Sequence, residues 1–332
     1  MTAGIIAALL VCPLTAVAAW RFARWMRERR LGQPIREEGP ARHQAKAGTP
    51  TLGGLVVLPI WAGAAGLLSL WLPFTAQEGF VLASGLAMGA VGAADDLIKL
   101  SRRQSLGLTG WQKIGLTVIV AAAVLFAFRH AIPSALRVPF SATTVPLPLW
   151  AIALLSIVVF VAATNAVNFT DGLDGLAAGV VLLILGGFLA LAPRLEDLAF
   201  LVPLLGALGG FLWMNAFPAG LIMGDAGSFG LGGVLAAVAL TQGTAFLFPL
   251  LAGVPVLEVV AVILQVASLR FFGKRLLRMS PLHHHFETSP GAAERKHFIP
   301  ACQWPETKVV IRFWIAQALF VGLALVAAHV GR

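Results

Sequence analysis

The sequence has few charged residues for its length. Asp, Glu, Lys and Arg together make up 12% of its 332 residues, whereas hydrophobic residues make up 58%. Soluble globular domains contain about 25% charged residues, so the composition excludes an ordinary soluble domain. Apolar stretches of about 20 residues recur along the chain, and this is the length that a helix needs to cross a bilayer. The sequence therefore predicts an all-α integral membrane protein.

Cysteine is also scarce. The two cysteines are Cys12, in a predicted membrane span, and Cys302, in a predicted loop, so we do not expect them to meet. This excludes a disulfide framework and a cysteine-based zinc site. The chain also lacks a low-complexity tail and a clear internal repeat.

The apolar stretches predict about ten transmembrane helices in a single polytopic domain covering residues 1–332. We expect the first to be retained, because no small-residue cleavage site followed by a soluble domain comes after it. The eighth and ninth are divided only by Thr241–Thr244. The predicted spans are 3–20, 53–73, 79–95, 113–129, 147–164, 175–192, 198–214, 228–242, 246–270 and 309–330.

Lys and Arg lie mostly in alternate connections between these spans. With the amino terminus outside, the inside segments 21–46, 99–113 and 270–312 hold 20 of the 24 basic residues. This is the positive-inside bias, and with ten spans it places both termini outside. Topology and affinity for anionic lipid then account for the net charge of +9, and we expect no nucleic-acid partner.

Five of the six aspartates fall in three short motifs, all at inside ends of odd-numbered spans. Polar side chains are costly in a bilayer, so their positions are informative. The first motif contains Asp95 and Asp96, followed by Lys99. Adjacent carboxylates repel each other unless they share a cation. The pair indicates either a shared cation or a solvated helix end that Lys99 neutralises.

The second motif follows the fifth span and contains Asn165, Asn168, Asp171 and Asp174 together with two glycines. Carboxylate and amide oxygens suit a hard cation such as Mg²⁺, and glycine lets the backbone approach a ligand. An Asx-rich turn between two helices is the structural alternative.

The third motif is Gly224–Ser228, which contains Asp225 and lies between Asn215 and further glycines. A glycine-rich segment that opens onto a helix gathers backbone N–H groups where phosphate binds. Asp225 could then hold Mg²⁺ against that phosphate. Glycines also serve close helix packing, which is the alternative here.

Basic and polar residues on the same predicted face complete the candidates. Lys46 and Thr51 lie in a Gly- and Pro-containing segment before the second span, and Lys113 lies in another inside segment. His283–His285 follow the ninth span. Consecutive residues cannot all face one site, so a three-histidine zinc centre is not expected. The run fits either phosphate contacts or a chance surface cluster.

Within the ninth span, Glu258 and Gln265 are seven residues apart and share a helix face. Gln265 is nearer the inside and could line a site, whereas Glu258 is expected to be structural. Carboxylates, amides, Lys and His on one membrane face are typical of Mg²⁺-assisted phosphoryl transfer between anionic partners, one of them a lipid.

These motifs resemble those of the polyprenyl-phosphate N-acetylhexosamine-1-phosphate transferase superfamily. The segments Lys46–Gly54, Pro281–Glu287 and Trp304–Trp314 are similar in particular to phospho-N-acetylmuramoyl-pentapeptide transferases. The resemblance runs in order from about Gln33 to Trp314. It implies a ten-helix fold with the active site on cytoplasmic loops, and it allows a homodimer.

The resemblance also implies a reaction and residue roles. Phospho-MurNAc-pentapeptide would pass from UDP-MurNAc-pentapeptide to undecaprenyl phosphate, giving lipid I and UMP, with Mg²⁺ as cofactor. It implies that Asp225 is the main Mg²⁺ ligand with Asn168 as partner, and that Asp95, supported by Asp96, activates the lipid phosphate. His284 joins these as a catalytic candidate. The candidate substrate-binding residues are Lys46, Thr51, Lys113, Asn165, Asn168, Asp171, Asp174, Asn215, Gln265, His283 and His285.

One segment departs from the family pattern, since residues 288–303 form an apparent inserted cytoplasmic loop before Trp304. Two alternatives stay open. One is a sister enzyme that transfers GlcNAc-1-phosphate to the same lipid, which the Lys46 segment and the histidine run disfavour. The other is a secondary transporter, which would place ionisable residues near the bilayer midplane.

Overall fold

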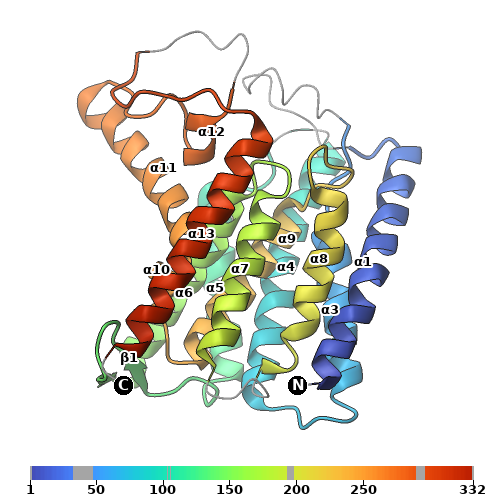
Figure 1. Ribbon diagram of the computed structural model, residues 1–332, viewed down its shortest axis with the longest axis vertical. Coiled ribbons are helices and arrows are strands. Elements are labelled where there is room, and N and C mark those ends of the chain that lie inside the picture. Colours follow the sequence, from blue (N-terminus) through green and yellow to red (C-terminus); the bar gives the residue numbers. More distant parts are fainter. Residues whose placement is uncertain are drawn as a thin grey trace.

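The computed structural model describes residues 2–32, 48–102, 104, 106–192, 198–288 and 296–330. Within them the chain is mostly helical, and its long helices run side by side (Figure 1). They are α1 (Thr2–Glu28), α3 (Gly54–Leu68), α4 (Ala76–Arg102), α5 (Gly110–Ala127), α6 (Leu149–Thr170), α7 (Leu176–Leu191), α8 (Val202–Asn215), α9 (Gly224–Thr241), α11 (Gly253–Phe272) and α13 (Glu306–His329).

Each predicted span overlaps one of these helices. Seven of the helices in the described part are long and apolar enough to cross a membrane, whereas α3, α7 and α8 are shorter apolar helices. The mostly helical membrane-protein fold is confirmed, and a count of ten crossings stays a prediction. Both termini lie at the end of the bundle opposite the short helix α12 (Leu282–Phe286) (Figure 1).

Two local features differ from the prediction. The expected span 246–270 is broken at Ala252, which separates the short helix α10 (Phe248–Leu251) from α11. The connection between α5 and α6 contains an antiparallel pair, β1 (Ala135–Arg137) and β2 (Thr144–Pro146), in a chain predicted to be all-α. Strands of three residues leave no periodic pattern in the sequence long enough to recognise.

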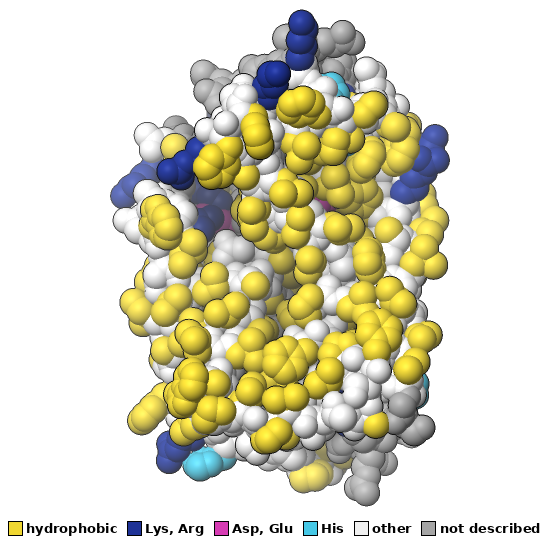
Figure 2. All heavy atoms as spheres, turned by 90° about the vertical axis from the view of Figure 1, so that its left-hand side faces the viewer, with side chains coloured by type: hydrophobic (Ala, Val, Ile, Leu, Met, Phe, Trp, Pro, Cys, Tyr) yellow, Lys and Arg dark blue, Asp and Glu magenta, His cyan; other side chains and the backbone are white. Residues whose placement is uncertain are grey.

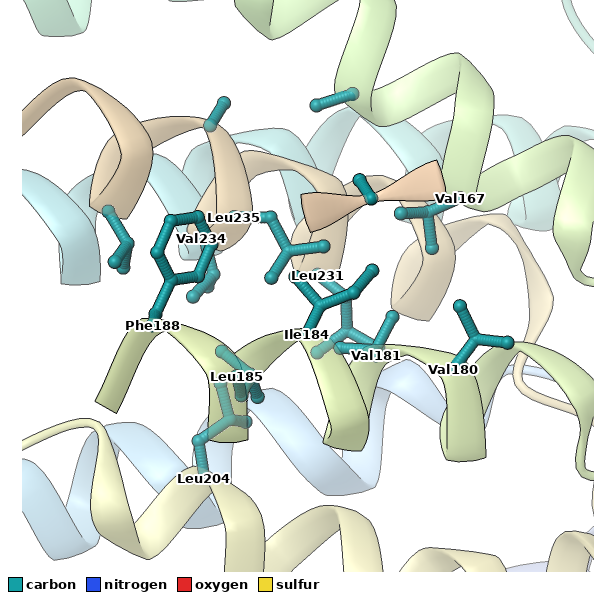
Figure 3. Close-up of a cluster of buried hydrophobic side chains, with 14 of the residues drawn as sticks. Val167, Val180, Val181, Ile184, Leu185, Phe188, Leu204, Leu231, Val234 and Leu235 are labelled. Atoms are coloured by element: carbon teal, nitrogen blue, oxygen red, sulfur yellow. The ribbon is translucent and has the colours of Figure 1, made fainter. Parts of the chain in front are cut away.

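Helix α9 lies at the centre of the bundle and packs against α4, α6, α3 and α7. Almost all of its side chains are buried, and most of them are Gly, Ala, Val or Leu. Small residues let helix backbones approach closely in a membrane protein. Ile184 and Phe188 of α7 point toward Leu231, Val234 and Leu235 of α9 (Figure 3).

The outer surface of the bundle is apolar. Many large hydrophobic side chains are exposed there, among them Trp111, Phe126, Trp150 and Leu319. Hydrophobic side chains cover most of the face drawn in Figure 2. A water-exposed surface of this kind would be unstable, whereas lipid tails solvate it well.

Candidate active site

Three carboxylates meet where α4 ends and α9 begins. Asp95 and Asp96 come from α4 and Asp225 comes from the first turn of α9. One oxygen from each lies within 4.8 Å of the others. This acidic cluster brings together the first and third sequence motifs, which are about 130 residues apart in the chain.

A glycine allows the two helices to come this close. A Cβ atom at Gly92, one turn before Asp96 on α4, would lie 2.0 Å from the backbone oxygen of Asp225. Such a distance is far inside van der Waals contact, so a larger residue at position 92 would push α4 and α9 apart. The close packing of the helices therefore sets the geometry of the cluster.

Two lysines bridge the carboxylates. Lys99 Nζ lies 2.6 Å from Asp95 Oδ2, 3.5 Å from Asp96 Oδ1 and 3.0 Å from Asp225 Oδ2. Lys113 Nζ lies 3.1 Å from Asp95 Oδ2 and also pairs with Asp225. The three carboxylates outnumber the two ammonium groups, so a further cation could be held in the cluster when all three are ionised.

Local structure holds the lysines in place. Lys99 is one turn beyond Asp95 on α4, as the sequence pattern predicted. Thr109 and Gln112 form a capping box at the start of α5, which places Lys113 in the first turn of that helix.

Backbone N–H groups orient the aspartates. Leu108 N–H donates to Asp95 Oδ1 at 2.6 Å, and Ala226 N–H donates to Asp96 Oδ2 at 3.0 Å. The amide nitrogen of Asn168 donates to Asp225 Oδ1 at 2.8 Å. In this arrangement the amide nitrogen of Asn168, rather than its oxygen, faces the predicted metal ligand.

Two polar residues predicted to bind substrate hold loops together instead of pointing into the acidic cluster. Asp174 is buried, and its Oδ2 accepts a hydrogen bond from Ala219 N–H at 2.9 Å. Asn215 accepts from Gly175 N–H and donates to Leu221 O. These bonds tie the α6–α7 connection to the α8–α9 connection, which supports the start of α9.

The remaining residues of the second motif lie on and after the last turns of α6. Asn165 Nδ2 donates to Val161 O of its own helix at 2.8 Å. Asp171 is the C-cap residue of α6 and is half-buried.

The segment before α3 runs alongside the loop that leads into α9. Ile222 N–H donates to Pro50 O, and Gly53 N–H donates to Ile222 O. Thr51 is buried in this segment, beside Gly224. Lys46 lies outside the described residues.

The three histidines are buried and point to different partners. His283 Nδ1 lies 3.0 Å from Glu258 Oε1, and His284 Nδ1 lies 3.0 Å from Glu287 Oε2. His285 Nε2 donates to Pro300 O at 3.2 Å. The rings of His283 and His284 lie against each other, with centroids 4.1 Å apart, although each ring binds a different carboxylate. The acidic cluster is the one group of three or more potential metal-ligating acids, cysteines or histidines found among the described residues.

His285 is held as a neutral ring. Its Nδ1 accepts a hydrogen bond from Arg278 N–H, and its Nε2 donates to a carbonyl. Burial lowers the pKa of His285 from 6.5. The hydrogen bond to Pro300 O opposes this shift, whereas the nearby charges of His297 and Arg278 add to it. Its imidazole therefore contributes shape and a fixed tautomer rather than a positive charge.

Gln265 has no side-chain contact with the acidic cluster. Its Oε1 accepts from Leu276 and Leu277 N–H, and its Nε2 donates to Leu277 O. It therefore fixes the connection that leads from α11 to α12.

Two contacts around this site were not predicted. Glu258 was expected to be structural, and its contact with the first histidine of the run is of that kind, but the partner was not predicted. Lys99 was expected to neutralise its own pair, yet it also reaches Asp225. The seven-residue spacing of Glu258 and Gln265 was the available signal for the first contact, and nothing local indicated the second.

The acidic cluster could hold a metal ion. Hard cations prefer carboxylate oxygens, and the cluster offers three carboxylates. Asp225 and Asp95 or Asp96 are the residues placed to hold it. Lys99 and Lys113 would remain at its edge, where phosphate oxygens also need positive charge.

Comparison with known proteins agrees with this chemistry. Residues 79–243, which include the acidic cluster, match the family described as glycosyl transferase family 4. A phospho-N-acetylmuramoyl-pentapeptide-transferase of Geobacillus thermodenitrificans is 38% identical over 94% of both chains. The protein of that name from Heliobacterium modesticaldum is 41% identical over 91% of both chains. The one from Shouchella clausii is 38% identical over 98% of this chain and 94% of the relative. The chain therefore belongs to the phospho-N-acetylmuramoyl-pentapeptide transferase family of phosphoglycosyl transferases.

Proposed function

We propose that this enzyme transfers phospho-MurNAc-pentapeptide from UDP-MurNAc-pentapeptide to undecaprenyl phosphate, giving lipid I and UMP, and that it requires Mg²⁺. The observation that carries the proposal is the meeting of Asp95, Asp96 and Asp225 with Lys99 and Lys113 at one end of an apolar helical bundle. Both substrates carry phosphate, so their reaction needs positive charge that brings two anions together.

The three carboxylates would have different roles, according to their positions in the cluster. Asp225 would hold Mg²⁺, which when bound neutralises phosphate charge, and Asn168 would orient Asp225 through its amide. Asp95 Oδ2 faces both lysines while its Oδ1 is fixed by Leu108 N–H. We assign Asp95 to the activation of the lipid phosphate, with Asp96 supporting it.

The nucleotide sugar would be bound around this centre. His284 is assigned a catalytic contact, and the other candidates are assigned to substrate binding. They are Lys46, Thr51, Lys113, Asn165, Asn168, Asp171, Asp174, Asn215, Gln265, His283 and His285. For Asp174, Asn215 and Gln265, the hydrogen bonds described above support an indirect contribution through loop positions.

Access from the membrane favours a lipid acceptor. Acidic and basic side chains lie recessed among hydrophobic ones in the upper part of the face in Figure 2. A polyprenyl chain could lie along this apolar surface while its phosphate reaches the lysines. Ten crossings, both termini on the periplasmic side and a cytoplasmic active site in the inner membrane complete the proposal, and a homodimer is compatible with it.

We also propose that the chain is a single polytopic domain and that residues 288–303 form an inserted cytoplasmic loop. The described part of this loop packs on the α11–α12 connection, where Phe298 N–H donates to Arg275 O and Ile299 N–H donates to Leu276 O. Residues 289–295 lie outside the described residues.

The test is Mg²⁺-dependent release of UMP by purified protein with undecaprenyl phosphate. We expect turnover with UDP-MurNAc-pentapeptide and none with UDP-GlcNAc. Turnover with UDP-GlcNAc alone would assign the sister reaction. If neither donor is turned over by protein that shows a cooperative thermal unfolding transition, the enzymatic role is contradicted and the transporter alternative is reopened.

A further inference from the structure

A cavity with both polar and apolar lining residues lies at the end of the bundle opposite the acidic cluster. This cavity of about 380 Å³ is lined by the first turn of α4 and the last turn of α9, whereas the acidic cluster lies at the opposite ends of these helices. Glu78 and Asp95 are 17 positions apart on α4, or about 26 Å at the rise of an α-helix. The cavity is therefore separate from the transferase site. Its volume falls in the range of small-molecule pockets.

The walls of this cavity are mainly apolar. Trp61, Val81, Leu201 and Val238 line it from four different helices or connections. Trp61 is fixed by a hydrogen bond from its ring nitrogen to Phe200 O at 2.9 Å. A rigid apolar wall of this kind suits a hydrocarbon chain.

Arg137 supplies positive charge at this cavity. It lies on β1, opposite Thr144 of β2, and both residues also line an adjoining cavity of about 360 Å³. The Arg137 side chain is half-buried, and no described residue accepts a hydrogen bond from its guanidinium or pairs with it. Glu78, also in the wall, is instead engaged at the start of α4, where it accepts from Thr75 N–H at 2.6 Å.

Gln242 supplies a buried acceptor in the same cavity. Its Nε2 donates to Phe188 O at 3.2 Å. Its Oε1 is buried and has no hydrogen-bond donor among the described residues. A buried oxygen in this state is unfavourable until a hydroxyl or amide donates to it.

We infer that this cavity binds an anionic amphiphile, with a phosphate on the guanidinium of Arg137, a hydroxyl on Gln242 and a hydrocarbon chain against the apolar wall. Guanidinium and phosphate match in geometry and form strong charge-assisted hydrogen bonds. The cavity is at an end of a membrane-spanning bundle, where lipid headgroups lie. This inference does not depend on which sugar the transferase uses.

The experiment measures lipid retention by delipidated protein with native mass spectrometry. Dioleoyl phosphatidylglycerol carries a net charge and free hydroxyls, and dioleoyl phosphatidylcholine carries neither. We expect the wild type to retain phosphatidylglycerol preferentially, and Arg137→Gln to weaken that binding about tenfold without affecting phosphatidylcholine. Thr144→Trp, at an exposed position where the two cavities meet, should block binding as well.

Arg129→Gln is the matched control, because Arg129 is an exposed arginine near the carboxyl end of α5 that does not line the cavity. It should bind phosphatidylglycerol as the wild type does. The assignment would be overturned if wild type and Arg137→Gln retained phosphatidylglycerol equally. It would also be overturned if Arg129→Gln lost as much phosphatidylglycerol binding as Arg137→Gln. Inorganic phosphate could instead raise the melting temperature of the wild type but not of Arg137→Gln, while phosphatidylglycerol is not retained. The site would then bind a free anion, and the assignment of an amphiphile would be wrong. Only variants that are monodisperse and that melt at the wild-type temperature without added lipid or phosphate are compared.

Discussion

His283 Nδ1 lies 3.0 Å from Glu258 Oε1, and both side chains are fully buried. Glu258 also accepts hydrogen bonds from the backbone N–H groups of Leu282 and His283. The other ring nitrogen of His283, Nε2, is buried and has no hydrogen-bond partner among the described residues. It is directed at Gly172, where a Cβ atom would lie 2.1 Å away. One carboxylate of α11 therefore positions α12 and the first histidine against the loop that follows α6.

Replacing Glu258 with Ala should destabilise the packing of α12 against α11. It removes the acceptor of three buried donors, and each buried group left without a partner costs about 1–3 kcal/mol. We expect a lower melting temperature and a loss of turnover, and Glu258→Gln should recover part of both because it keeps one acceptor oxygen. Glu28→Gln is the control, because Glu28 forms an exposed pair with Arg24 that contributes little to stability. A melting temperature unchanged by Glu258→Ala would contradict the positioning role.

Asp225→Asn should reduce UMP release by about a hundredfold or more, because it removes the negative charge that would hold the metal and that pairs with two lysines. The measurement is turnover across a Mg²⁺ titration, with EDTA as the metal-free reference. Ser228→Ala, which removes only a neighbouring hydroxyl that Asn168 donates to, should have a much smaller effect. Near-normal turnover of Asp225→Asn at saturating Mg²⁺ would exclude the metal assignment.

Asp95→Asn separates catalysis from binding. The substitution keeps the shape of the side chain and removes its capacity to accept a proton. We expect kcat to fall by about a hundredfold, the usual scale for loss of a general base, with little change in affinity for the UDP-sugar. Affinity is measured by calorimetry without the lipid acceptor. Loss of nucleotide affinity with turnover preserved would show that Asp95 binds the donor instead.

Gly92→Ala tests the close approach of α4 and α9. The added methyl group would overlap the backbone oxygen of Asp225, so we expect a loss of about 1–3 kcal/mol in stability and a loss of activity. Gly115→Ala on α5 is the matched control, because a Cβ atom there meets nothing within 4 Å. Alanine should be neutral or stabilising there, by about 0.5–1 kcal/mol. If both variants behave alike, helix packing does not set the cluster geometry.

The neutral state of His285 predicts a pH dependence of stability. Its pKa is lower in the folded protein than the ordinary 6.5, so the unfolded chain takes up the proton first. Its contribution is therefore fully present above about pH 6.5 and is lost as the pH falls through the folded pKa. Melting temperatures from pH 8 to pH 5 should fall less steeply for His285→Asn than for the wild type. Parallel curves would show that His285 does not contribute.

The positions of the helices were predictable because they follow from the length of apolar runs. Asp95, Asp171 and Asp225 were also expected on one membrane face, since the positive-inside bias fixes which connections share a side. The break at Ala252 and the short strands β1 and β2 were not predicted. A one-residue interruption and two three-residue strands change the hydrophobic pattern too little to be detected.

The functions of individual polar residues were less predictable. Asp174, Asn215 and Gln265 were predicted to bind substrate, and this stays a prediction. In the fold their side chains also form hydrogen bonds to the backbone of neighbouring connections. A carboxylate or amide in the sequence is equally suited to a substrate and to a loop, so the sequence did not predict these backbone contacts.

The amino-acid sequence alone was enough to predict a helical membrane protein whose acidic motifs gather on one face, because both properties depend on the cost of polar groups in lipid. Only the folded structure shows that Asp96 and Asp225 meet, that Lys99 and Lys113 join them, and that the three histidines bind different partners. These outcomes depend on how closely α4 approaches α9 and on where α12 packs against α11. Such distances arise from contacts between segments far apart in the chain, and no local pattern in the sequence encodes them.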